Sequence, residues 1–334
     1  MGHRKHSSPR RGSLAFIPRA RRQKLIPRVR TWPTISSDKP TILGIPTFKA
    51  GSIHVMTSDD REKTPNFGKP LFNASTVLAT VPITIIGFRA YLKGYDGLQP
   101  FTDVFAENLP KELERKFKMN TKGSEEKIKP ITDNLSNIKQ VSALVSVTPE
   151  DALLSQKKPF IFEVIIGGGD IKSQVEYAKS MLGKSIKASD VFKAGMMVDV
   201  IGVTKGKGFE GPVTRMGIKR KQHKSRKSVR AVGVLNPWHP STIMYTVPRA
   251  GQMGFHQRMD RNKRILAIAN AKDQPITPAG GFLHYGNVQN DYLIVKGSVP
   301  GPIKRLVTLK LPSRHVKVKA EPPKILQIST VPKR

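Results

Sequence analysis

Several features that would narrow a protein's chemistry are missing from this chain of 334 residues. It contains no cysteine, which excludes disulfides, thiolate metal sites and cysteine nucleophiles. No apolar run approaches the roughly 18 residues that a transmembrane helix needs, so we expect none. Acidic residues are scarce, because 24 Asp and Glu stand against 58 Lys and Arg. The function must therefore be sought in a strong excess of positive charge.

The formal net charge is +34 at pH 7. Such a charge makes the isolated chain repel itself, and it is typical of a protein that binds a polyanion. DNA, RNA or an anionic membrane would fit this charge, whereas an acidic small substrate would not require it. A hydrophobic content of 38% still allows a buried core.

The charge is most concentrated in the central stretch Gly202–Leu266, which is also rich in glycine. Its apolar residues follow neither a helical nor an alternating period, so we expect no core of its own. Basic, core-less segments order on RNA, and RNA is therefore the favoured partner. The predicted RNA-binding cations of this stretch are Lys205, Lys207, Arg215, Lys219, Arg220, Lys221, Lys224, Arg226, Lys227, Arg230, Arg249, Arg258, Arg261, Lys263 and Arg264.

One tryptophan and three histidines of the same stretch are also predicted to bind RNA. Trp238 lies among prolines in cationic sequence, which favours an exposed loop tip that stacks on bases over a place in the core. His223, His239 and His256 lack carboxylates at metal-ligand spacing, which favours RNA contact or plain packing.

Residues 1–40 form a second basic stretch, in which repeated prolines break helices. A disordered tail or a localisation signal is one interpretation, and an extension that follows RNA is the favoured one. Its predicted RNA-binding residues are Arg4, Lys5, Arg10, Arg11, Arg19, Arg21 and Arg22.

The rest of the chain indicates a mainly β fold with an α/β insertion. Short β-rich runs punctuated by Gly and Pro, such as those at Gly51 and Gly87, suggest a small barrel or sandwich. Acid-rich residues 100–190 show helical spacing at Val104–Asn120 and Ser173–Ser185, with a strand in Pro159–Gly168. The expected organisation is a basic extension at 1–40, barrel segments at 41–99, 191–204 and 265–334, an inserted lobe at 100–190, and a long basic loop at 205–264.

Evidence for catalysis is absent from the sequence. The GGGD of Gly167–Asp170 stands where phosphate-binding loops occur, but it lacks their spacing, which favours an ordinary strand-to-helix turn. We predict no catalytic residue, no metal and no cofactor. An RNA-processing or RNA-modifying enzyme that holds RNA with the basic stretch remains the alternative, and a peripheral protein on anionic membrane is a third.

Three segments carry a family resemblance: MGHRKHSSPRRGSLAF at the start, GVTKGKGFEGPVTRMG from Gly202, and NPWHPSTIMYTVPRAGQMGFHQRMDRNKRI from Asn236. They closely resemble the universal ribosomal protein L3 family of the large subunit, in its archaeal and eukaryotic form. The resemblance implies a translation-protein-type β-barrel with an inserted lobe and long irregular basic extensions. It also marks His223 and Gln252 as candidates for modification, and Gln252 as a further RNA-binding residue.

The same resemblance implies a function. Such a protein is a cytoplasmic, non-enzymatic constituent of the large ribosomal subunit, present in one copy per ribosome. It would bind large-subunit ribosomal RNA near the 3′ end, contact neighbouring ribosomal proteins and help to nucleate assembly. Its central extension, with Trp238 at the tip, would reach toward the peptidyl transferase centre. No membrane and no small-molecule substrate are implied.

Overall fold

The computed structural model describes residues 9–116, 123–314 and 321–331. The chain divides into two compact units. The smaller combines the described part of residues 1–25 with Val203–Gln257, and the larger combines Ile26–Gly202 with the described part of residues 258–334. Each unit joins segments that are distant in the sequence.

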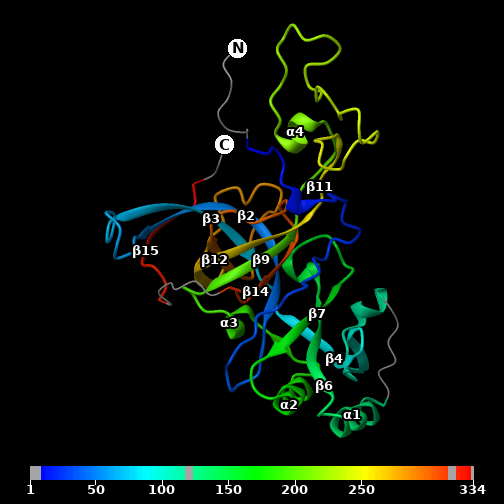
Figure 1. The fold of residues 1–334 in the computed structure, drawn as a ribbon. Coiled ribbons are helices and arrows are strands. Elements are labelled where there is room, and N and C mark those ends of the chain that lie inside the picture. Colours follow the sequence, from blue (N-terminus) through cyan, green and yellow to red (C-terminus); the bar gives the residue numbers. More distant parts are fainter. Residues whose placement is uncertain (1–8, 117–122, 315–320, 332–334) are drawn as a thin grey trace. The chain divides into compact units, whose positions relative to one another are not determined.

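The larger unit contains a seven-stranded antiparallel sheet in the order β14-β9-β12-β13-β3-β2-β15 (Figure 1). A further pairing of β14 with β2 brings the sheet back on itself, so that it forms a nearly closed ring. Its strands are β2 (Gly44–Ser58), β3 (Pro70–Ala79), β9 (Met197–Val203), β12 (Gln257–Asn270), β13 (Asp291–Lys296), β14 (Leu306–Lys310) and β15 (Ile325–Ser329).

A second antiparallel sheet of the same unit has the order β1-β7-β6-β4-β5, with β8 paired to β4. Its strands are β1 (Thr41–Ile42), β4 (Ile83–Gly94), β5 (Gly97–Phe105), β6 (Ile138–Val147), β7 (Phe160–Gly167) and β8 (Ser185–Ile186). Helix α1 (Ser124–Asp133) packs against β5, and α2 (Ile171–Ser180) packs against β6 and β7. The short helices are η2 (Lys111–Arg115), η3 (Pro149–Ala152) and α3 (Ala188–Val191). The mainly β prediction is confirmed.

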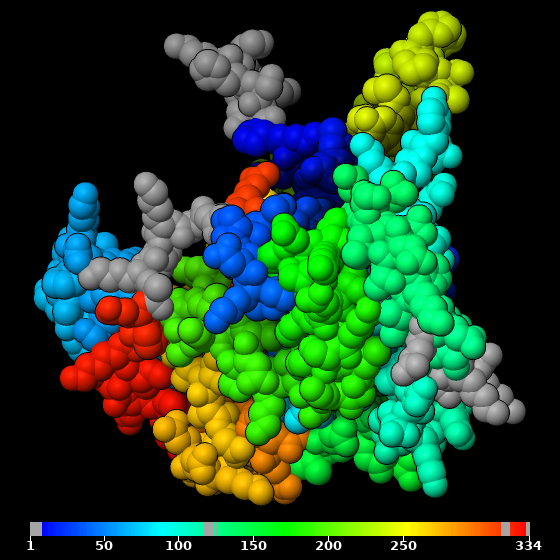
Figure 2. Space-filling view, turned by 90° about the horizontal axis from the view of Figure 1, so that it is seen from below, coloured from blue at the N-terminus to red at the C-terminus, as the bar shows by residue number. Residues whose placement is uncertain are grey.

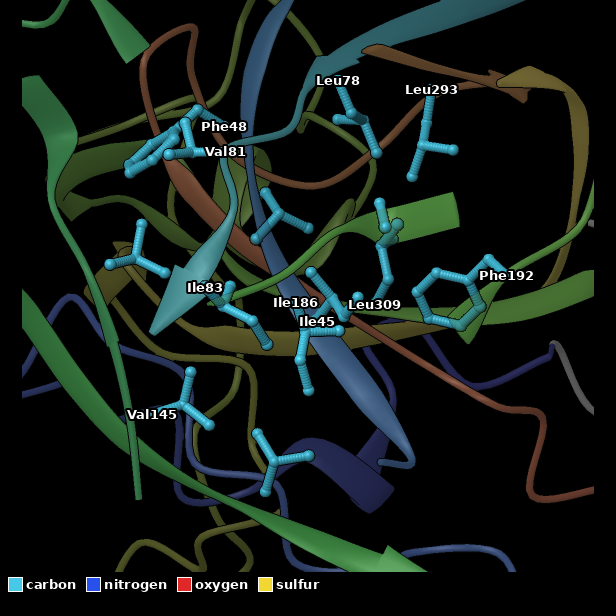
Figure 3. Packing of buried hydrophobic residues seen from close by; sticks show 14 of the residues in the cluster. Ile45, Phe48, Leu78, Val81, Ile83, Val145, Ile186, Phe192, Leu293 and Leu309 are labelled. Carbon is cyan, nitrogen blue, oxygen red and sulfur yellow. The ribbon is translucent and has the colours of Figure 1, made fainter. Parts of the chain in front are cut away.

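One hydrophobic core joins the two sheets of the larger unit (Figure 3). Ile45, Phe48 and Leu309 come from the ring, and Ile83 and Val145 come from the second sheet; all are buried. Each such side chain contributes about 1.5–3 kcal/mol when it leaves water. In Figure 2 gold and orange surface that includes loop 271–290 lies beside green surface from the middle of the chain. Tyr285 supports that contact by donating a hydrogen bond to the carbonyl of Ala152 at 3.1 Å.

Glycines expected to end strands instead lie within them. Strand β2 continues through Gly51, where its pairing with β3 shifts register. A Cβ on Gly51 would lie 2.3 Å from the Phe282 ring, so the position requires a residue without a side chain. A similar shift occurs beside Gly87 in β4. At these positions glycine allows a side chain to pack closely on the strand or accompanies a β-bulge. The sequence pattern alone does not distinguish such a glycine from one in a turn.

The helix expected at Val104–Asn120 is wrong for residues 104–116. Val104 and Phe105 end β5, and only the 3-10 turn η2 follows. Residues 117–120 lie outside the described part. Pro110 disfavours helix in the residue before it, and Leu113 is the one buried side chain of η2. The expected helix at Ser173–Ser185 corresponds to α2, which ends at Ser180. Among the described helices, none is both long and apolar enough to cross a membrane.

Candidate nucleic-acid interface

Positive charge is concentrated in the smaller unit. Across its described residues, seventeen Lys and Arg face one acidic residue, Glu210. Its cations are Arg10, Arg11, Arg19, Arg21, Arg22, Lys24, Lys205, Lys207, Arg215, Lys219, Arg220, Lys221, Lys224, Arg226, Lys227, Arg230 and Arg249. Hydrophobic burial is slight in this unit, so repulsion among these charges is opposed by few packing contacts.

Ion pairing differs between the two units. In the larger unit Arg89 is bound by two carboxylates, with Asp103 at 2.5 Å and with Glu163. The hydrogen bond of Arg89 to Asp103 is the main cause that raises the pKa of Arg89, and the charge of Glu163 raises it further. In the described residues of the smaller unit no cation forms an ion pair with Glu210. The positive charge of the smaller unit therefore remains available to an external anion.

A short hairpin organises the smaller unit. Strand β10 (Gly206–Glu210) pairs antiparallel with β11 (Gly251–Gly254), bringing Phe209 opposite Gln252. Gly254 has φ of +74°, and a Cβ there would lie 2.0 Å from the carbonyl oxygen of Lys205. Only glycine fits this position. Helix α4 (Pro212–Met216) follows β10 and ends at Gly217, which has φ of +69°.

The N-terminal segment lies along the hairpin (Figure 1). The backbone N–H of Arg22 donates to the carbonyl of Phe255 at 2.9 Å. The His256 ring places Nδ1 3.0 Å from the carbonyl oxygen of Ala20. Arg19, next to the 3-10 turn η1 (Leu14–Phe16), donates to the carbonyl of Arg215 at 2.8 Å. Residues 9–25 of the first basic stretch and 203–257 of the second thus form one unit.

Arg215 holds this unit together from within. Its Nε donates to the carbonyl of Gln252, and its Nη1 donates to that of Arg249, each at 3.0 Å. Burial, and then the charge of Arg19, lowers the pKa of Arg215. Arginine nevertheless stays protonated in proteins. This guanidinium therefore orders the backbone of the hairpin as well as adding to its charge.

Most of the predicted RNA-binding residues are exposed. Trp238 is 88% exposed, with its ring 6.5 Å from that of His239 in an edge-on arrangement, so it occupies the surface rather than the core. Arg4 and Lys5 lie outside the described residues. The other exposed residues of the set are Arg10, Arg11, Arg21, Lys205, Lys207, Lys219, Arg220, His223, Lys224, Arg226, Lys227, Arg230, His239, Arg249 and Arg261.

The remaining members are partly or fully buried. Arg19, Arg22, Arg215, Lys221, Gln252, Arg258 and Lys263 are half-buried. His256 and Arg264 are buried. Arg264 lies on β12 in the larger unit, where it pairs with Asp60 at 2.6 Å and donates to the carbonyl of Glu321. This position gives Arg264 a structural role between β12 and the loop after β2.

Sequence patterns missed several exposed apolar side chains among these cations. Phe209 is 80% exposed and Tyr245 is 74% exposed, and Val234 and Met244 are exposed as well. The signal that singled out Trp238, an aromatic in cationic sequence, applied equally to Phe209 and Tyr245. Both are suited to stack on bases.

A metal site and a phosphate-binding loop find little support in the described residues. No group of three His, Cys, Asp or Glu is placed to hold a metal there. The turn at Gly168 and Gly169 is closed by the chain itself, because the Gly169 N–H donates to the carbonyl of Ser37 at 2.6 Å. A Cβ on Gly168 would lie 2.5 Å from the carbonyl oxygen of Lys39, so the chain itself fills the space on that side of the turn.

Comparison with known proteins adds a family likeness over nearly the whole chain. The profile of the family described as ribosomal protein L3 matches residues 1–329. The large ribosomal subunit protein uL3 of Methanocaldococcus jannaschii is 45% identical over 329 residues, covering 98% of this chain and 97% of that protein. Proteins of the same name are 43% identical in Methanococcus aeolicus, over 99% of this chain and 98% of the relative, and 42% identical in Methanobrevibacter smithii, over 99% of both.

Proposed function

The chain belongs to the ribosomal protein L3 family, whose members are non-enzymatic structural proteins of the large ribosomal subunit, and from this membership we propose that it binds large-subunit ribosomal RNA directly. The contact would lie near the 3′ end of that RNA, and it would help to nucleate subunit assembly. The exposed cations of the smaller unit, which form no ion pair among its described residues, are the observation that carries this proposal.

The physical basis is phosphate neutralisation with release of counterions. Each phosphate neutralised by Lys or Arg contributes about −0.7 to −0.9 to the slope of log affinity against log salt. With seventeen Lys and Arg against Glu210 in the smaller unit, even a minority of contacts would give a steep dependence. We propose that the free protein needs RNA to neutralise this unit, and that assembly begins with this step.

We further propose that residues 205–264 act as the central extension and approach the peptidyl transferase centre. The exposure of Trp238, Phe209 and Tyr245 supports this role, because bases can stack on such side chains. In this proposal the ring of the larger unit is the translation-protein-type barrel, residues 100–190 form its inserted lobe, and residues 1–40 form the second extension. Neighbouring large-subunit proteins are the other partners, in the cytoplasm and with one copy per ribosome.

Site-directed photocrosslinking in whole ribosomes tests this proposal. A photoreactive phenylalanine analogue would replace Trp238 and, in a control, Tyr95, which is fully exposed in the turn between β4 and β5. Crosslinked nucleotides would be mapped by sequencing. We expect position 238 to crosslink near the peptidyl transferase centre and position 95 elsewhere. Crosslinks from position 238 that fall only at the outer surface of the subunit would refute the extension.

The enzyme alternative is set aside by family membership. The membrane alternative would need an amphipathic helix with a basic polar face. In the described part of the basic unit the one α-helix is α4, five residues long, which is too short for such a role. RNA remains the polyanion that this charge fits best.

A further inference from the structure

A cleft of about 480 Å³ lies within the smaller unit, between the N-terminal segment and the hairpin β10–β11. Its volume is in the roughly 300–1,000 Å³ range of sites that take small ligands. Three adjacent residues of the N-terminal segment and four of the hairpin region line it. They are Arg21, Arg22, Gln23, Gly206, Gly208, Gln252 and Phe255.

The lining favours an anion over a cation. It includes two arginines, Arg21 and Arg22, and no acidic residue. The Nε of Arg22 is buried and has no hydrogen-bond partner among the described residues. A buried donor without an acceptor costs about 1–3 kcal/mol, so a small shift of the Arg22 side chain that brings this N–H to an acceptor in the cleft would be favourable. A phosphate oxygen is the acceptor that arginine binds most strongly.

The other walls suit a planar, polar ring. Phe255 offers an aromatic surface, and Gly206 and Gly208 expose backbone without side chains. Gln252 donates both amide hydrogens internally, because its Nε2 lies 3.3 Å from the carbonyl oxygen of Met253 and 3.1 Å from that of Gly254. The amide plane is thereby held, and what Gln252 offers a ligand is its Oε1 acceptor. Bases present N–H donors on their pairing edges.

We propose that this cleft binds one unpaired nucleotide that is turned out of the ribosomal RNA. Its phosphate contacts Arg22, with Arg21 beside it, its base packs against Phe255, and Gln252 Oε1 accepts a hydrogen bond from the base. The inference rests on the proposed RNA-binding function and adds a specific subsite to it. It also explains why the N-terminal segment must lie against the hairpin: neither segment alone supplies both the guanidinium groups and the ring.

Two variants alter the cleft in different ways, and each has a matched control. Gly206→Val fills the space, since a Cβ there would make ordinary contact with Phe255 at 3.7 Å. Gly211→Val is its control, because a Cβ on Gly211 meets nothing within 4 Å. Arg22→Met removes the guanidinium and keeps the backbone hydrogen bond to Phe255. Lys24→Met removes one exposed cation of the same segment outside the cleft.

Large subunits carrying each variant would be probed with base-specific reagents for all four nucleotides. We expect one unpaired nucleotide, protected in the unaltered subunit, to gain reactivity about 5-fold to 100-fold in both cleft variants. That range corresponds to about 1–2.8 kcal/mol, within the roughly 1–3 kcal/mol of a stacked base. The two controls should leave that nucleotide protected, and the rest of the footprint should be the same in all four.

Three other outcomes are informative: two would refute the cleft proposal, and the third would refute the proposed RNA-binding function. If the footprint persists but no nucleotide distinguishes the cleft variants from their controls, the cleft proposal fails and RNA binding stands. If a photocrosslinker at Gln23 captures a ribosomal protein rather than RNA, a protein fills the cleft and the proposal is again wrong. If the unaltered protein leaves no footprint on the RNA, the proposed function itself fails.

Discussion

A buried ion pair between β9 and β14 leads to a sharp stability prediction. Lys310 and Asp199 are 0% and 1% exposed, with 3.8 Å between Nζ and the nearer carboxylate oxygen. Asp199 also accepts hydrogen bonds from the backbone N–H groups of Asn262 and Ser313, each at 3.0 Å. Lys310 donates to the carbonyl of Thr31 at 2.5 Å. Burial lowers the pKa of Lys310, and the charge of Asp199 opposes that effect.

The substitution Lys310→Met keeps the volume of the side chain and removes its charge. Breaking a buried pair by removing one partner costs about 3–5 kcal/mol, since the remaining charge is uncompensated. Because Asp199 retains its backbone donors, we expect a loss near the low end, about 3 kcal/mol. The control is Lys263→Met, whose pair with Asp260 also spans 3.8 Å but is 23% and 38% exposed. Exposed pairs contribute about 0–1 kcal/mol. The two variants therefore differ through the burial of the Lys310 pair and the hydrogen bonds that Lys310 donates to Thr31 and Ser313.

Urea unfolding provides the measurement, in a background where Trp238→Phe leaves Trp32 as the fluorescent reporter. Trp32 packs against the core and directly follows Thr31, which accepts the hydrogen bond from Lys310. Circular dichroism would follow the sheets in parallel. Equal losses of stability in Lys310→Met and Lys263→Met would refute the reasoning. A second check uses an Asp199→Leu background. There Lys310→Met should increase the free energy of unfolding, because it removes an unpaired buried charge.

Three further predictions concern other parts of the chain. Burial raises the pKa of Tyr285 to about 12, so the folded chain holds this proton more tightly than the unfolded chain. The resulting contribution to stability is complete below pH 10. The free energy of unfolding should then fall by about 1.4 kcal/mol per pH unit as pH rises from 10 toward 12. Urea unfolding across this range should show a shallower fall in Tyr285→Phe; an unchanged slope would contradict the prediction. Gly254→Ala should break the β10–β11 hairpin, raising amide exchange there but not in β2 and β3, whereas Gly211→Ala should change neither; protected β10 amides in the first variant would count against it. Trp238→Ala should leave the fold and RNA affinity nearly unchanged while disturbing tRNA-dependent translation, a prediction that ribosomes with normal translation and drug sensitivity would contradict.

The local patterns succeeded where neighbouring residues determine the structure. The β-rich runs became β2, β3 and β4, and the charged helical period became α2. They failed at Val104–Asn120, where charges at helical spacing occur in a segment that the end of β5 and Pro110 hold in other conformations. Tertiary pairing of β5 with β4 outweighs helix preference there.

The candidate interface divides in the same way. Net charge is a sum over residues, so composition was enough to indicate a polyanion, and a lone Trp238 among cations was enough to suggest an exposed aromatic. Which cations face outward is a different question. Arg264 is buried against Asp60, and no pattern within the basic stretch indicates that partner.

Composition and motif therefore predicted the mainly β class, the family and a polyanionic partner, because these properties are carried by residue types and short spacings. Tertiary structure alone decided that the sheet returns on itself through β14 and β2, and that parts of the two basic stretches form one unit. It also created the cleft between Arg22 and Phe255. The physical reason is distance along the chain: Arg19 and Arg215 are 196 positions apart, and their hydrogen bond depends on a backbone geometry that only the folded chain brings about.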